Sequence, residues 1–170
     1  MKIIVFALLL GLVGVNGRVF AATPGEVEVG GVLREAPMQG LAGPSRLLSA
    51  YRGMPLIINV WASWCGPCRM EMGSLERLYR RYGCKRFQVI GISTDDYVEP
   101  AQATLRESRI TFGNFIDSRL FMENMLGANR IPLTLLVDGQ GRVLGKYYGA
   151  KDWDGPAAID LIEKAFRIKL

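Results

Sequence analysis

The sequence contains no histidine among its 170 residues. A Ser-His-Asp triad, a Cys-His protease site and a histidine-rich zinc or copper site therefore cannot be built from this chain. Cysteine is scarce as well, with only Cys65, Cys68 and Cys84. Structural zinc sites take four ligands, so three thiols alone are an incomplete set. We expect the chain to bind no metal and no other cofactor.

The chain also lacks a strong charge bias, an internal repeat and a low-complexity segment. Its net charge is +5, and its 49% hydrophobic and 22% charged residues are ordinary for a globular protein. No basic stripe with interleaved aromatic residues is visible, so we expect no nucleic-acid partner. A chain of this length predicts one folded domain with a proper core, and we expect a monomer.

No hydrophobic run reaches the roughly 20 residues of a membrane-spanning helix. The N-terminal run, residues 3–15, has 13 residues; Lys2 precedes it, and small residues follow up to Ala21. This pattern is typical of a secretory signal peptide, residues 1–21, cleaved after Ala21. Removing it takes away Lys2 and Arg18, which lowers the net charge from +5 to +3. An uncleaved anchor is the alternative, and both interpretations predict a periplasmic or otherwise extracytoplasmic protein.

What the chain does contain is a pair of cysteines in the run Cys65-Gly66-Pro67-Cys68. An apolar run before them predicts a buried strand, and the residues after them (69–81) predict an amphipathic helix. Cys65 should therefore lie at a helix N-terminus, where free N–H groups and the helix dipole stabilise a thiolate. A Cys-X-X-Cys pair in this position favours dithiol–disulfide exchange. A structural disulfide or half of a metal site is the alternative.

The remaining pattern predicts an α/β fold. Strands are expected at residues 56–61, 87–93, 115–116, 133–137 and 142–148, and helices at 69–81, 100–108, 120–126 and 157–167. This order predicts a mixed central sheet with helices on both faces, formed by residues 45–170. Residues 22–44 are rich in Gly and Pro and predict a lead-in with one or two edge strands, at 26–29 and 32–33. Ser45 and Asp154 are expected to cap helices, the first a short one that ends near Tyr51.

Several stretches together resemble the TlpA/ResA branch of the thioredoxin superfamily. They are the run from Trp61 to Arg69 with Glu71, Asn59 ahead of it, Gly91-Ile92-Ser93 with Asp95-Asp96, and Arg130-Ile131-Pro132-Leu133-Thr134 with Val137-Asp138-Gly139-Gln140-Gly141. The resemblance covers residues 33–166. It implies a thioredoxin-like fold with an N-terminal extension and a central helix/strand insert near residues 98–127. It also implies an extracytoplasmic thiol–disulfide oxidoreductase, most often a reductant that serves cytochrome c maturation.

The resemblance implies roles for the two cysteines. Cys65 is the solvent-facing nucleophile, and Cys68 attacks the mixed disulfide, releases the substrate and leaves a Cys65–Cys68 redox disulfide. The Gly66-Pro67 dipeptide also occurs in thioredoxin, whose potential is about −270 mV, which favours a reductant. Potentials also depend on neighbouring groups, so an oxidant or isomerase stays an alternative.

The resemblance also points to a substrate surface around Cys65. Ile131-Pro132 resembles the cis-proline loop of the fold, which would place the Ile131 backbone beside the Cys65 sulfur, where it pairs with an extended substrate segment. A trans proline that opens a strand is the alternative. Trp64 is expected to form an apolar contact surface, whereas Trp61 is expected in the core. The predicted substrate-binding residues are Trp64, Gly66, Pro67, Ile131 and Pro132.

Glu71 matches an acid that relatives carry, which implies a role in proton transfer and substrate contact. The alternative is a glutamate favoured near a helix start by the dipole. Asn59 stands where cytoplasmic thioredoxins have a buried aspartate. An amide does not accept a proton as a base, so the role of general base passes to Glu71, to water or to no group.

The leading hypothesis is a reductase of protein disulfides, with apocytochrome c as a candidate substrate. A reductant in an oxidising compartment must be recharged, which implies a membrane thiol-electron donor of the DsbD/CcdA type. A peroxiredoxin-like peroxidase needs Thr three residues before the nucleophile, and Ala62 stands there. A metal-binding assembly factor of the Sco type needs Cys-X-X-X-Cys and a histidine, which are missing. Cys84 predicts either a buried free thiol or an intermolecular disulfide.

Overall fold

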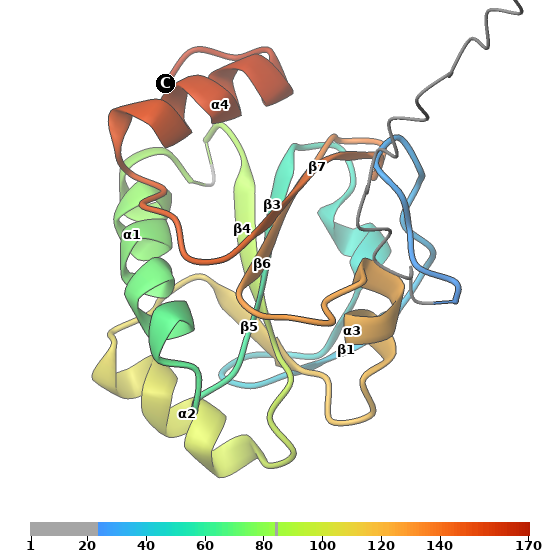
Figure 1. Ribbon diagram of the computed structural model, residues 1–170, viewed down its shortest axis with the longest axis vertical. Coiled ribbons are helices and arrows are strands. Elements are labelled where there is room, and N and C mark those ends of the chain that lie inside the picture. The colour runs from blue at the N-terminus through green and yellow to red at the C-terminus, as the bar shows by residue number, and fades with distance from the viewer. Residues whose placement is uncertain (1–23, 84) are drawn as a thin grey trace, which may run out of the picture.

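The computed structural model describes residues 24–83 and 85–170, which form a single seven-stranded sheet with the order β2-β1-β5-β4-β3-β6-β7 (Figure 1). The predicted signal segment and Cys84 lie outside the described residues. Within the described part, no helix is long and apolar enough to cross a membrane. The strands are β1 (Pro37–Gly40), β2 (Arg46–Leu47), β3 (Leu56–Trp61), β4 (Gln88–Ser93), β5 (Gly113–Ile116), β6 (Leu133–Val137) and β7 (Val143–Tyr148).

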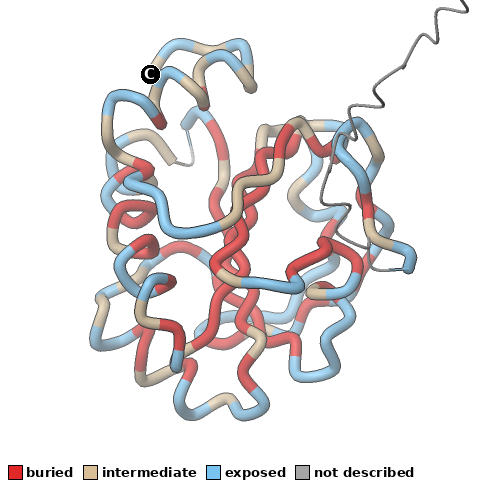
Figure 2. The backbone as a smooth tube through the Cα atoms, viewed as in Figure 1, coloured by how far each residue is buried: buried red, intermediate tan, exposed pale blue. Residues whose placement is uncertain are grey.

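The sheet is mixed, as the sequence predicts. Strands β3, β4 and β5 run parallel, whereas β1, β2, β6 and β7 pair with their neighbours in antiparallel fashion. Strands β3 and β6 are buried along their whole length, and Figure 2 shows these central strands as the buried middle of the molecule. Near-continuous apolar runs are what a strand covered on both faces requires, so the sequence located these strands well.

Helices cover both faces of the sheet. They are α1 (Gly66–Tyr82), α2 (Val98–Glu107), α3 (Phe121–Leu126) and α4 (Pro156–Phe166), with one 3-10 helix, η1 (Leu48–Tyr51). Alternate residues of β3 serve the two faces: Ile57 and Trp61 pack with α1, α2 and α4, whereas Ile58 packs with α3 and η1. The predicted α/β sheet with helices on both faces is thus confirmed, with α2, β5 and α3 where the central insert was expected.

The lead-in differs from the prediction. The edge strands expected at residues 26–29 and 32–33 do not form; the lead-in instead contributes β1, which lies between β2 and β5, and Val32 makes only an isolated bridge with Arg142. Gly30, with a positive φ of 92°, turns the chain between the two expected strands. The segment instead follows β7, because Gly30 N donates to the carbonyl of Val143 (2.8 Å).

Both predicted side-chain caps are wrong. Residues after Ser45 form β2, η1 begins after Leu47, and Ser45 Oγ accepts a hydrogen bond from Gly40 N (3.2 Å). Helix α4 begins after Gly155, with Pro at its first position, and the Asp154 carboxylate binds Arg77 instead. In each case the side-chain oxygen binds a partner outside the helix it was expected to cap.

Candidate active site

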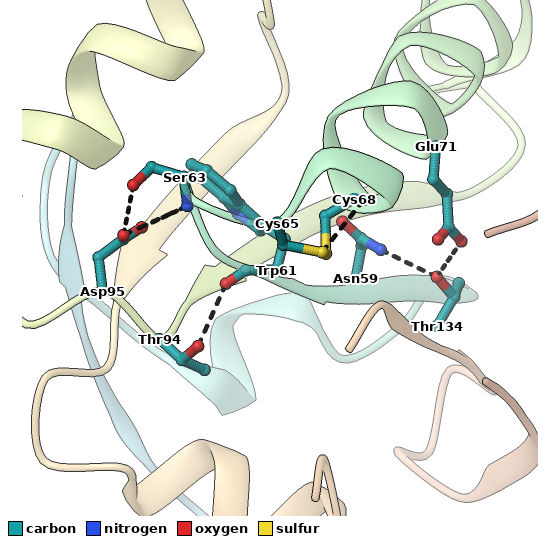
Figure 3. Close-up of a disulfide and its surroundings, with 9 residues drawn as sticks. All are labelled: Asn59, Trp61, Ser63, Cys65, Cys68, Glu71, Thr94, Asp95 and Thr134. Carbon is teal, nitrogen blue, oxygen red and sulfur yellow. Dashed lines mark hydrogen bonds between the residues drawn. A yellow bond between two sulfur atoms is a disulfide. The ribbon is translucent and has the colours of Figure 1, made fainter. Parts of the chain in front are cut away.

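Cys65 lies where β3 leads into α1 and is the N-cap residue of that helix. Its sulfur accepts a hydrogen bond from the backbone N–H of Cys68 (3.2 Å), and a disulfide joins the two cysteines, whose Cα atoms are 5.3 Å apart (Figure 3). Helix α1 begins three residues earlier than predicted, because Pro67 is accepted at its second position and supplies no N–H where none is needed. A thiolate at Cys65 would thus meet the positive end of α1, as the sequence predicts.

The two sulfur-bearing residues differ in their access to solvent. Cys65 is 7% exposed, and Cys68 is fully buried. A substrate sulfur approaching from solvent therefore meets Cys65 first. Beside it, Trp64 is 72% exposed, whereas Trp61 is fully buried, so both tryptophans lie as the sequence predicts.

A buried carboxylate, Asp95, fixes the loop that leads into Cys65. Its two oxygens accept hydrogen bonds from Ser63 N (2.9 and 3.2 Å) and Ser63 Oγ (2.6 Å) (Figure 3). Asp95 Oδ2 also accepts a hydrogen bond from Ser93 Oγ (2.6 Å). Ser63 is two residues before Cys65, so this network limits where the nucleophile can lie. Asp95 belongs to the stretches that carry the family resemblance, but its bonding to Ser63 was not predicted from the sequence.

Glu71 joins a buried hydrogen-bond network between α1, β3, β6 and the loop after β7. Its Oε1 accepts from Thr134 Oγ1 (2.8 Å) and from the indole Nε1 of Trp153. Thr134 Oγ1 in turn accepts from Asn59 Nδ2 (3.0 Å), so the amide and the carboxyl share one hydroxyl (Figure 3). Sequence reasoning missed Thr134 and Trp153, because neither residue is near Glu71 in the chain.

The electrostatic setting of Glu71 is unusual. It is 1% exposed, and neither its Oε2 nor Asn59 Oδ1 has a hydrogen-bond partner among the described residues. Burial raises the pKa of Glu71 from 4.5 to about 7, whereas the hydrogen bonds from Trp153 and Thr134 act to lower it. The side chain lies beyond the first turn of α1, so the alternative of a dipole-favoured helix-start glutamate is not supported. A carboxyl with this pKa exchanges a proton near neutral pH.

The Ile131–Pro132 peptide bond is cis, which confirms the predicted form of this loop. Pro132 is buried, and the half-buried Ile131 packs against the core cluster that contains both cysteines. Gly149 N donates to the Pro132 carbonyl (2.9 Å), which ties the loop to the end of β7. Contact of these residues with a substrate stays a prediction.

Comparisons with known proteins agree with this geometry. Residues 34–152 match the model of the AhpC/TSA family. Thiol-disulfide oxidoreductase ResA of Geobacillus thermodenitrificans is 26% identical over 144 residues, which cover 84% of this chain and 83% of the relative. ResA of Bacillus cereus is 26% identical over 152 residues, which cover 87% and 86%.

A solved structure supports the same fold. A Chlorobium tepidum protein described as a thiol:disulfide interchange protein DsbE superposes with a TM-score of 0.76 at 26% identity. The match covers 82% of this chain and 99% of that protein. The thioredoxin-like architecture and the resemblance to ResA-type oxidoreductases are thereby confirmed.

Proposed function

Because this chain belongs to the AhpC/TSA family and is a thiol–disulfide oxidoreductase, we propose that it reduces disulfide bonds of proteins outside the cytoplasm. The observation that carries the proposal is the pairing of Cys65, which is 7% exposed at the N-terminus of α1, with a fully buried Cys68. In this proposal the Cys65 sulfur attacks the substrate, and the Cys68 sulfur resolves the intermediate.

The reaction begins with the reduced pair. The Cys65 thiolate attacks one sulfur of a substrate disulfide, a mixed disulfide forms, and the other substrate sulfur leaves as a thiolate. The Cys68 thiolate then attacks the Cys65 sulfur, which forms the Cys65–Cys68 disulfide and releases the second substrate sulfur. The substrate gains two electrons, and the enzyme loses two.

Glu71 is the proposed proton-exchanging group. It lies one helical turn after Cys68, and its pKa of about 7 supports gain and loss of a proton at working pH. The Thr134 hydroxyl connects it to Asn59, which takes no proton itself. This leaves the carboxyl as the group in the network that titrates near neutrality.

A substrate segment is proposed to bind across the exposed edge of the site. The residues that would contact it are Trp64, Gly66, Pro67, Ile131 and Pro132. The exposure of Trp64 supports an apolar contact beside Cys65. The Gly66-Pro67 dipeptide supports a reducing role, because thioredoxin carries the same pair at a potential of about −270 mV.

The proposed location and partners rest on the N-terminal pattern and on the resemblance to known oxidoreductases. The N-terminal pattern and the similarity to ResA and DsbE support an extracytoplasmic protein, released by cleavage after Ala21 or held by an uncleaved anchor. Apocytochrome c is the proposed substrate, and a membrane thiol-electron donor of the DsbD/CcdA type is the proposed source of electrons.

A trapping experiment tests the proposal. Purified Cys68→Ser protein, which lacks the resolving thiol, is mixed with an oxidised peptide that carries Cys-X-X-Cys-His, the haem-attachment motif of c-type cytochromes. We expect a stable mixed disulfide at Cys65, located by mass spectrometry, and none in the matched Cys65→Ser control. Adducts found only on Cys84 would show that the nucleophile is assigned wrongly.

A peroxiredoxin-like peroxidase is the rival within reach of this fold. That chemistry requires Thr three residues before the nucleophile, and the residue there is Ala62, which is fully buried. We therefore expect negligible hydrogen peroxide turnover by the reduced protein. Robust turnover that depends on Cys65 would reverse the ranking of the two functions.

A further inference from the structure

The loop between β7 and α4, residues 149–155, is attached to one side of α1 at three points. The attachment residues on α1 are Glu71, Ser74 and Arg77, spaced three apart and therefore on neighbouring turns of one helix face. Ser74 Oγ accepts a hydrogen bond from Trp153 N (2.9 Å), and Arg77 binds the Asp154 carboxylate with two hydrogen bonds (2.7 and 2.8 Å). The third attachment is the hydrogen bond from the Trp153 indole to Glu71.

Trp153 is placed as a rigid donor. Its side chain is fully buried, and its ring packs edge-on against Tyr147 with the ring centroids 5.7 Å apart. An indole has one polar atom, Nε1, and here that atom donates to Glu71 Oε1. Packing holds the indole ring in place, and the hydrogen bond from Trp153 N to Ser74 Oγ holds the Trp153 backbone. The indole N–H is thereby directed at Glu71.

The carboxyl of Glu71 is therefore held from two sides. Thr134 donates to Oε1 from the sheet, and Trp153 donates to the same oxygen from the loop, whereas Oε2 receives no hydrogen bond from the described residues. We propose that Trp153 is a positioning residue, whose indole N–H holds the Glu71 carboxyl against Thr134 beside the redox pair. The importance of this for disulfide exchange rests on the proposed role of Glu71.

The groups that face Glu71 define what a test must control. Lys151 acts from the same loop and lowers the Glu71 pKa by its charge. From the sheet the facing groups, Thr134 and Asn59, are uncharged, and on α1 the nearby titratable group after reduction is Cys68. Measuring the oxidised protein removes the thiol from this set, because a disulfide does not titrate.

The experiment follows the Glu71 carboxyl directly in the disulfide-bonded protein. The side-chain carboxyl carbons of glutamate are labelled with carbon-13, the Glu71 signal is identified by its loss in Glu71→Gln, and its shift is followed from pH 4 to pH 9. Trp153→Phe keeps an aromatic ring but removes the donor that favours the ionised form. We expect the Glu71 midpoint to rise by about one pH unit.

Two further variants separate positioning from structure. Arg77→Ala detaches the neighbouring attachment of the same loop and should leave the Glu71 midpoint unchanged. If Trp153→Phe fails to fold, Trp153 is replaced by benzothienylalanine, in which sulfur takes the place of the indole N–H at nearly the same shape. The same upward shift is expected.

An unchanged midpoint in the folded variants would overturn the positioning role and leave Trp153 a packing residue. The test also separates the two proposals. If the Glu71 midpoint shifts in Trp153→Phe, the positioning role of Trp153 is supported. If the pH profile of disulfide exchange by the same variant nevertheless stays unaltered, that result contradicts the proposed role of Glu71 in catalysis.

Discussion

Asp95 and Glu71 are two buried carboxyl groups that flank the disulfide in Figure 3, with exposed fractions of 3% and 1%. They are bonded in opposite ways. Both oxygens of Asp95 accept hydrogen bonds, from Ser63 and Ser93, whereas Glu71 has both of its donors on Oε1 and none from the described residues on Oε2. Asp95 therefore braces the loop before Cys65, whereas Glu71 keeps one carboxyl oxygen without a hydrogen bond from the described residues. The distribution of donors makes the difference.

Removing the brace should have the largest effect on stability. Asp95→Ala leaves the N–H and hydroxyl of Ser63 and the hydroxyl of Ser93 without their acceptor, which costs about 4 kcal/mol of unfolding free energy in total. Urea unfolding of the disulfide form measures this loss. Asp96→Ala is the matched control, because Asp96 is exposed, and it should change stability by less than about 0.5 kcal/mol. Equal effects at the two positions would contradict the brace.

The second prediction concerns pH. Between pH 4.5 and about 7, Glu71 is protonated in the folded protein but ionised in the unfolded chain. Its contribution to stability is therefore full below pH 4.5 and is lost as pH rises to about 7. The loss is at most about 3 kcal/mol. Glu71→Gln removes this dependence, since Gln does not titrate.

The measurement is the difference in unfolding free energy between wild type and Glu71→Gln at pH 4 and at pH 8. Other titrating groups cancel in this difference. We expect wild type to lose stability relative to the variant as pH rises. A constant difference would show that folding leaves the Glu71 pKa unshifted, and a change of opposite sign would show that folding lowers it; either result would contradict the raised pKa.

The third prediction concerns the Thr134 hydroxyl, which connects Asn59 to Glu71 by hydrogen bonds. Thr134→Val keeps the shape but leaves the buried Asn59 Nδ2 without its acceptor, which costs about 2 kcal/mol. It also removes a donor from Glu71, so the Glu71 pKa should rise further. Thr134→Ser keeps the hydroxyl and is the control. A Thr134→Val protein more stable than Thr134→Ser would show that the shared hydroxyl contributes nothing.

The smallest effect is expected at the exposed end of the same helix face. Arg77 is 62% exposed, and its ion pair with Asp154 is largely in water. Arg77→Ala should therefore cost about 0.5 kcal/mol by urea unfolding. A loss above about 2 kcal/mol would mean that the β7–α4 loop depends on this ion pair rather than on the buried bonds of Trp153.

The sequence predicted the parts of the site whose signals are local. The apolar run of β3, the proline inside α1 and the proline after Ile131 each carry their structural meaning within a few residues. The bonds that distinguish the two carboxyls are not local: Asp95 is 32 residues from Ser63, and Glu71 is 63 residues from Thr134. No short-range sequence pattern predicts such pairs.

The two cap predictions failed because other donors bind the side-chain oxygens. Ser45 and Asp154 look like helix caps because their side chains suit that role, but Ser45 Oγ binds Gly40 N in the preceding strand and Asp154 binds Arg77, which is 77 residues away. Trp153 was not singled out in the sequence, and only the structure shows that its indole N–H donates to a carboxyl 82 residues away.

The central claim is that Cys65 and Cys68 form a reducing dithiol. The most direct test is a redox titration of this pair against glutathione and dithiothreitol buffers in a Cys84→Ser background, where no other thiol contributes. We predict a reduction potential of about −270 mV, like that of thioredoxin. A potential of about −120 mV, like that of a strong oxidant, would contradict the reductase function.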